Sequence, residues 1–128
     1  MNRAGGRFAA TLCILIVSWG PRWTPAHHSY AMFDFSVMSR VSGAVRTFEW
    51  SNPHVWLWLT VVDDKGAASD YAFEGYSIGE MMRKLGWTKS TVTPGDRVVV
   101  SYFPFKDGKN GGRLSKVTLP DGRTLEGL

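Results

Sequence analysis

Cysteine is almost absent from this 128-residue chain. The single one, Cys13, lies in an apolar run near the N-terminus. Disulfide frameworks need pairs of cysteines, and thiolate zinc sites usually need several. We therefore expect no disulfide and no thiolate metal site, so the roughly one hundred residues beyond the N-terminal segment must be held together by core packing.

Clustered basic charge is also lacking. The net charge is +4 at pH 7, but Arg3, Arg7 and Arg22 supply three of these charges, which leaves 4 − 3 = +1 on the rest of the chain. Nucleic-acid binding depends on a clustered basic face. We therefore expect no nucleic-acid partner.

No apolar run is long enough to cross a membrane. The longest, residues 8–17, falls well short of the ~20 residues that a spanning helix requires. Two arginines precede it, and the small residues of 24–26 follow a Gly-Pro break, which is the layout of a cleaved secretory signal peptide. We predict a signal peptide over 1–26 and no stable membrane insertion after its removal. A retained anchor is the alternative.

The stretch from His54 to Val62 has the strict alternation of a β-strand. One face is aliphatic: Val55, Leu57, Leu59 and Val61. The other face carries His54, Trp56 and Trp58. We expect the aliphatic face to form the core, and the aromatic face either to bind something or to be covered by another segment.

Further strands are predicted on both sides of this one. After an N-terminal arm over 27–38, the strands cover 39–50, 55–62, 69–74, 97–105 and 113–119. The apolar face of the first strand switches after Val45 to Phe48 and Trp50, which predicts a β-bulge near Thr47.

A short helix is predicted between the third and fourth strands. Ser77 and Glu80 form an S-x-x-E capping box, and Gly86 suits a left-handed C-cap. Three strands, one helix and two strands is the order of the OB-fold, a five-stranded Greek-key barrel. We therefore expect an all-β, OB-like barrel over 39–128, with a β-sandwich as the alternative.

Several sequence blocks together resemble one protein family. They are Ala26-His27-His28-Ser29, the segment 48–56 (FEWSNPHVW), Gly86-Trp87 and Pro94-Gly95-Asp96. The family is an uncharacterised one of small exported proteobacterial proteins, grouped as a domain of unknown function. The resemblance implies a periplasmic protein and favours a small barrel, but it implies no activity.

The three histidines suggest a copper site. If cleavage follows Ala26, the α-amino group and imidazole of His27 could chelate one ion, with His28 beside them and His54 completing the site. Copper accepts such nitrogen ligands readily. A second version places Cu(I) beside Trp56 and Trp58 with Met32 or Met38, similar to a small periplasmic copper chaperone with an OB-fold.

A metal-free role is the other interpretation of these residues. Trp50, Trp56 and Trp58 could form a ligand-binding face for a small molecule or a periplasmic protein partner, because OB barrels usually bind on that face. Alternatively, the aromatic residues of the arm could cover the tryptophans. We do not expect an enzyme, because no acid is identified that would orient a histidine beside a serine nucleophile.

Overall fold

The structure, a computed structural model, describes residues 30–128. Within this range lie a short 3-10 helix, η1 (Tyr30–Met32), six strands and one α-helix, α1 (Ile78–Leu85). The strands are β1 (Ser39–Glu49), β2 (Trp56–Val62), β3 (Ala68–Glu74), β4 (Arg97–Pro104), β5 (Gly111–Thr118) and β6 (Thr124–Glu126).

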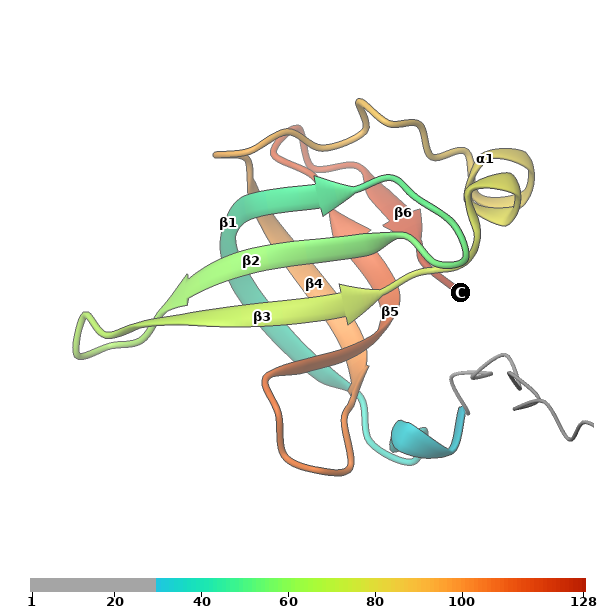
Figure 1. Cartoon of the computed structure of the whole chain (residues 1–128). Helices are drawn as coiled ribbons and strands as arrows, with labels where there is room; N and C mark the ends of the chain where they lie inside the picture. The colour runs from blue at the N-terminus through green and yellow to red at the C-terminus, as the bar shows by residue number, and fades with distance from the viewer. Residues whose placement is uncertain (1–29) are drawn as a thin grey trace, which may run out of the picture.

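Five of the strands close into a barrel (Figure 1). The sheet order is β3-β2-β1-β4-β5-β6, and β3 also pairs in parallel with β5 through residues 72–74 and 111–113. The helix α1 lies between β3 and β4. This confirms the predicted five-stranded OB-like barrel and excludes the β-sandwich.

The barrel interior is filled by the predicted aliphatic face of β2. Leu57 and Leu59 are fully buried, and they pack with Phe73 from β3 and Val98 and Val100 from β4. Directly opposed residues in a sheet share a face, so Trp58 and its partner Ala72 lie on the outside. The alternation of β2 therefore separates a dry core from an aromatic outer face, as predicted.

The predicted bulge in β1 is confirmed. The register between β1 and β2 shifts between Val45 and Thr47, so one extra residue bends β1. Before the bulge, β1 also pairs with β4, and after it β1 pairs with β2 alone. The bend thus lets one long strand contribute to both halves of the barrel.

The helix α1 begins and ends at the predicted caps. The Ser77 hydroxyl accepts a hydrogen bond from the Glu80 amide, and Gly86 adopts the left-handed conformation at φ 73°. Trp87 follows the cap and is buried, with its indole N–H donating to the Glu126 carbonyl at 2.7 Å. The helix and the C-terminal strand β6 are therefore attached to the same core.

The N-terminal arm packs against the end of β4. Phe33 is buried, pairs as an isolated bridge with Phe105, and places its ring 5.2 Å from that residue's ring. The ring of Phe35 lies 5.0 Å from that of Phe103. The ring contacts of Phe33 and Phe35 with the barrel are thus to Phe103 of β4 and Phe105 just after it, and not to the tryptophans of β2.

The structure adds a sixth strand to the five that were predicted: β6 pairs with β5 through Lys116, Val117 and Thr118. No helix within residues 30–128 is long and apolar enough to cross a membrane.

Candidate ligand-binding site

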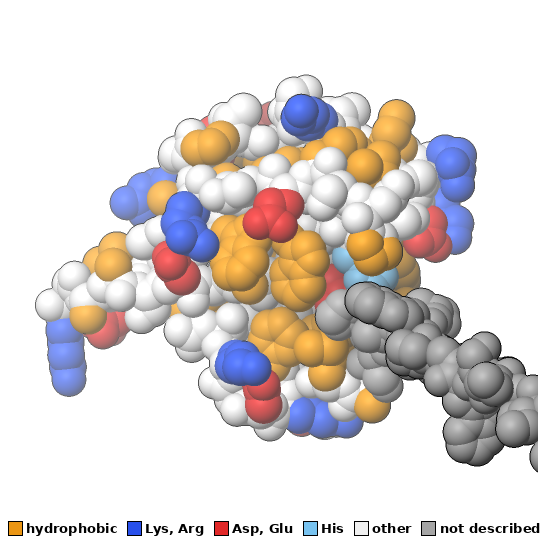
Figure 2. Space-filling view, in the orientation of Figure 1, with side chains coloured by type: hydrophobic (Ala, Val, Ile, Leu, Met, Phe, Trp, Pro, Cys, Tyr) orange, Lys and Arg blue, Asp and Glu red, His pale blue; other side chains and the backbone are white. Residues whose placement is uncertain are grey.

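A cavity of about 390 Å³ lies on the outer face of β2 and β3. Its lining comes from those two strands and from the loop between β4 and β5: Trp56, Trp58, Asp70, Ala72, Phe105, Lys109 and Asn110. Figure 2 shows hydrophobic side chains gathered at the centre of this face, with acidic and basic side chains beside them. The site is thus an aromatic patch with a polar edge.

The two tryptophans form the main apolar surface of the cavity. Trp56 and Trp58 are two residues apart on β2, so both project outwards, and their ring centroids are 6.2 Å apart with 30° between the planes. Both are half-buried. Ala72, directly opposite Trp58 on β3, has too small a side chain to cover the indoles. The pair therefore remains accessible to a ligand.

An ion pair borders the tryptophans on one side. Arg46 places Nη1 3.3 Å from Asp70 Oδ2, and its guanidinium lies 5.4 Å from the centroid of the Trp58 ring. Asp70 Oδ1 also accepts a hydrogen bond from the Thr60 hydroxyl. Because both charges are satisfied within the protein, this edge adds polar groups without adding net charge.

The opposite wall is held in place by backbone contacts at the start of β5. The Asn110 carbonyl accepts a hydrogen bond from the Ala72 amide at 3.3 Å. Gly111, at φ 109°, approaches β3 so closely that a Cβ there would lie 2.0 Å from the Ala72 oxygen. Only glycine fits such an approach. The loop thereby brings Asn110 and Lys109 over the β3 side of the cavity.

Lys109 is a stable positive charge on this wall. Its ammonium lies 2.9 Å from Asp107 Oδ2. The hydrogen bond and attraction between them raise the pKa of Lys109, and hydrogen bonds from Lys109 lower the pKa of Asp107. Both groups are therefore charged at neutral pH, and they compensate each other.

A buried charged cluster lies next to the cavity. Glu74 is opposite Trp56 on the same outer face, and it pairs with both Arg113 and His54. Arg113 donates from Nη1 to Glu74 Oε1 at 3.2 Å and to the Gly75 carbonyl at 2.8 Å, with its guanidinium 4.4 Å from the Tyr76 ring. Glu74 and Arg113 are each only 1 % exposed.

This cluster is incompletely hydrogen-bonded. Glu74 Oε2 and the Nε and Nη2 atoms of Arg113 are buried without a hydrogen-bond partner. Sequence reasoning did not find the cluster, because its charged pair is 39 residues apart and joins only through the parallel pairing of β3 with β5. No local signal marks such a pair.

The predicted site residues are only partly brought together. Trp56 and Trp58 line the cavity, and His54 precedes them with Nδ1 against Glu74 Oε1. Trp50 is not among the lining residues, because it packs against the core beside Phe48 at a ring distance of 5.4 Å.

The predicted metal ligands cannot all be placed. His27 and His28 lie outside the described residues. Among residues 30–128, no three His, Cys, Asp or Glu side chains are grouped so that they could hold a metal ion.

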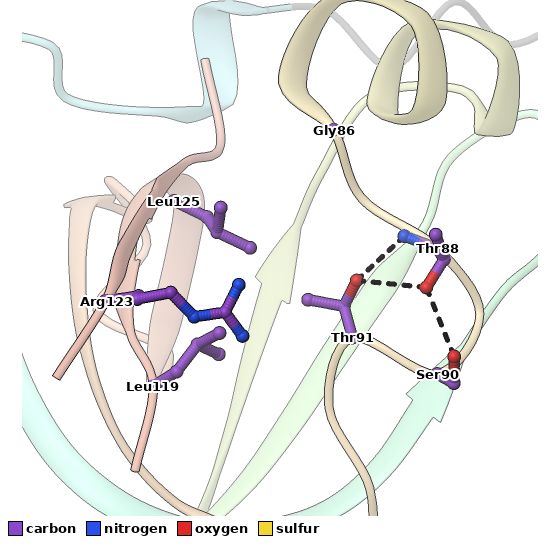
Figure 3. A pocket seen from close by; sticks show the side chains of 7 residues that line it. All are labelled: Gly86, Thr88, Ser90, Thr91, Leu119, Arg123 and Leu125. Atoms are coloured by element: carbon purple, nitrogen blue, oxygen red, sulfur yellow. Dashed lines mark hydrogen bonds between the residues drawn. The ribbon is translucent and has the colours of Figure 1, made fainter. Parts of the chain in front are cut away.

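Two other hollows lie at the α1–β4 loop. One, of about 620 Å³, is bordered by Phe48, Val92 and Pro94. The other, of about 300 Å³, lies between this loop and the β5–β6 turn (Figure 3). In it, Arg123 faces a set of hydroxyls, but Thr88 is hydrogen-bonded to both Ser90 and Thr91, and Arg123 Nε is paired with Asp121. Neither hollow is lined by a pair of neighbouring aromatic rings, as the tryptophan cavity is.

Comparison with known proteins gives one match. Residues 16–115 match a family described as Family of unknown function (DUF6152). No curated protein and no solved structure matches the chain.

Proposed function

The chain belongs to the family of unknown function DUF6152, and we propose that it is a periplasmic binding module whose ligand occupies the cavity over Trp56 and Trp58. Its signal peptide would direct export and would then be removed. The partner would be a small molecule or an exposed segment of another periplasmic protein, and no reaction would be catalysed.

The position of the cavity is the observation that carries this proposal. OB barrels commonly bind ligands on the face of their second and third strands, together with adjoining loops. The cavity lies on the outer face of β2 and β3 and is completed by the β4–β5 loop. Its volume is within the ~300–1,000 Å³ of ordinary ligand sites, and its lining combines large apolar groups with a few polar ones.

The lining also favours binding over catalysis. Nucleophilic catalysis requires a hydroxyl or thiol next to a base. The seven residues that line the cavity include no Ser, Thr, Cys or His. Its polar groups are suited to orienting a ligand by hydrogen bonds.

The proposal can be tested by a thermal-shift screen of the exported, processed protein against amino acids, nucleosides, sugars and short peptides. A true ligand should raise the unfolding temperature of the wild type and have little effect on Trp58→Ala. Trp50→Ala is the matched control, because it removes a half-buried tryptophan outside the cavity. The proposal is wrong if no compound raises the unfolding temperature of the wild type. It is also wrong if every active compound raises the unfolding temperature of Trp58→Ala by the same amount.

Copper binding is a second candidate, favoured by the environment of His54. Metal-ligating histidines commonly direct one ring nitrogen to a carboxylate, which orients the other nitrogen towards the metal. His54 has this arrangement with Glu74. The ion would be held by the α-amino group and imidazole of His27, by His28 and by His54.

Calorimetric titration with copper, with the intact mass read on the same sample, would test this candidate. We expect one-to-one binding by a chain that begins at His27, and loss of binding when one residue is added before it. A processed chain that starts at His27 and binds no copper would contradict the hypothesis.

A further inference from the structure

We infer that the ligand of the tryptophan cavity is an uncharged carbohydrate. This inference rests on the proposed binding function and names the chemical class that the cavity fits. Three features of the cavity support it: the aromatic surface, the balance of charge and the arrangement of polar groups.

The aromatic surface suits the apolar face of a sugar ring. A pyranose ring carries C–H groups on its faces and hydroxyls around its edge. The face of an indole is electron-rich and attracts the weakly positive C–H hydrogens. Trp56 and Trp58 form a continuous surface, with centroids 6.2 Å apart, on which such a ring can lie.

The charge balance disfavours an anionic ligand. Lys109 is the cation among the lining residues and Arg46 borders the cavity beside Trp58; they are already paired with Asp107 and Asp70 at 2.9 and 3.3 Å. The four charges sum to zero. Nucleotides and single-stranded nucleic acids require unpaired basic groups beside the stacking surface. An uncharged ligand leaves both ion pairs intact.

The polar edge suits hydroxyl groups. Asp70 presents a carboxylate, Asn110 a side-chain amide and Lys109 an ammonium group, all in the cavity lining. These groups accept and donate hydrogen bonds, and bonds to charged groups are stronger than neutral ones. Adjacent hydroxyls of a sugar can both donate and accept. The combination of an apolar surface of two indole rings and a mixed polar edge therefore matches one sugar ring.

The test is a calorimetric and tryptophan-fluorescence titration of the exported, processed protein. The probes are three neutral tetrasaccharides (cellotetraose, maltotetraose and chitotetraose), a thymidine oligonucleotide and an alanine tetrapeptide. We expect binding of at least one tetrasaccharide, weakened about tenfold or more by Trp56→Ala and by Trp58→Ala. Trp50→Ala should leave the affinity unchanged. Because no net charge is involved, raising the salt concentration should change the affinity little.

The other outcomes distinguish a wrong ligand class from a wrong binding function. Binding of the oligonucleotide or tetrapeptide alone, lost in both tryptophan variants, would overturn the carbohydrate class and leave the cavity as the binding site. Tetrasaccharide binding that both tryptophan variants retain would overturn this inference and place the ligand elsewhere. If none of the probes binds and the thermal-shift screen is also negative, the binding function fails as well.

Discussion

Glu74 and Arg113 form an ion pair on the outer face of the barrel that is nevertheless almost completely buried. Arg113 Nη1 lies 3.2 Å from Glu74 Oε1, and the two residues are directly opposed where β3 and β5 pair in parallel. Tyr76 and Tyr30 place their rings 4.4 and 5.5 Å from the guanidinium. The ion pair therefore lies where the pairing of β3 with β5 closes the barrel, and its arginine also contacts Tyr30, the first described residue of the arm.

Breaking this pair should be costly. Arg113→Met leaves the buried Glu74 carboxylate without its arginine and with only the His54 contact, which is expected to lower the free energy of unfolding by about 3–5 kcal/mol in urea denaturation. Arg46→Met is the matched control, because its partner Asp70 is half-exposed and such pairs contribute about 1 kcal/mol or less. Adding Glu74→Leu to Arg113→Met should restore much of the loss. Equal losses in the free energy of unfolding for Arg113→Met and Arg46→Met would contradict the larger contribution assigned to the buried pair.

The close approach of Gly111 to β3 gives a second prediction. Gly111→Ala forces a Cβ to within 2.0 Å of the Ala72 oxygen and should cost about 3 kcal/mol or more, because strain and overpacking add. Gly108→Ala, in the same loop at φ 80°, meets no atom within 4 Å and should cost about 1–2 kcal/mol. Thermal unfolding of both variants provides the comparison. A smaller effect at Gly111 would show that the loop does not rest on β3.

The arm offers a matched pair of aromatic residues. Phe33 is 2 % exposed and Phe35 is 45 % exposed. Phe33→Ala should lower the free energy of unfolding by about 3 kcal/mol, because it removes a buried ring from Phe105. Phe35→Ala should cost about 1 kcal/mol, the scale of a single aromatic contact. Similar values for both would mean that the arm is not anchored by Phe33.

Local patterns made most of the fold predictable. The alternation of β2 identified Leu57 and Leu59 as core residues, and the change of face in β1 predicted the bulge that the register shift confirms. The helix caps at Ser77 and Gly86 are equally local. Each of these signals depends on residues that are close in the sequence, so no knowledge of the three-dimensional arrangement was needed.

The candidate site was less predictable, because it depends on distant pairings. The alternation placed Trp56 and Trp58 on one face, but nothing near them indicated Phe105, Lys109 or Asn110. These residues reach the cavity only because β5 pairs with β3 and the Asn110 carbonyl binds the Ala72 amide. Trp50 was expected on the same face, but it packs against the core and does not line the cavity.

The capping box of α1 leads to a prediction about pH. Hydrogen bonds from Ser77 and Lys84 lower the pKa of Glu80 below its ordinary value of 4.5. A carboxyl group whose pKa is lower in the folded state stabilises the fold above its unfolded pKa, and this contribution is lost as the pH falls through the folded pKa. Ser77→Ala should cost about 1 kcal/mol at pH 7 because the cap is lost, and the cost should decrease towards pH 3 as Glu80 becomes protonated.

Glu80→Gln is the control: in that background, the effect of Ser77→Ala should not depend on pH. Urea denaturation of the four proteins at pH 7 and pH 3 measures both effects. A cost of Ser77→Ala that is the same at both pH values in the wild-type background would contradict the coupling between Ser77 and Glu80.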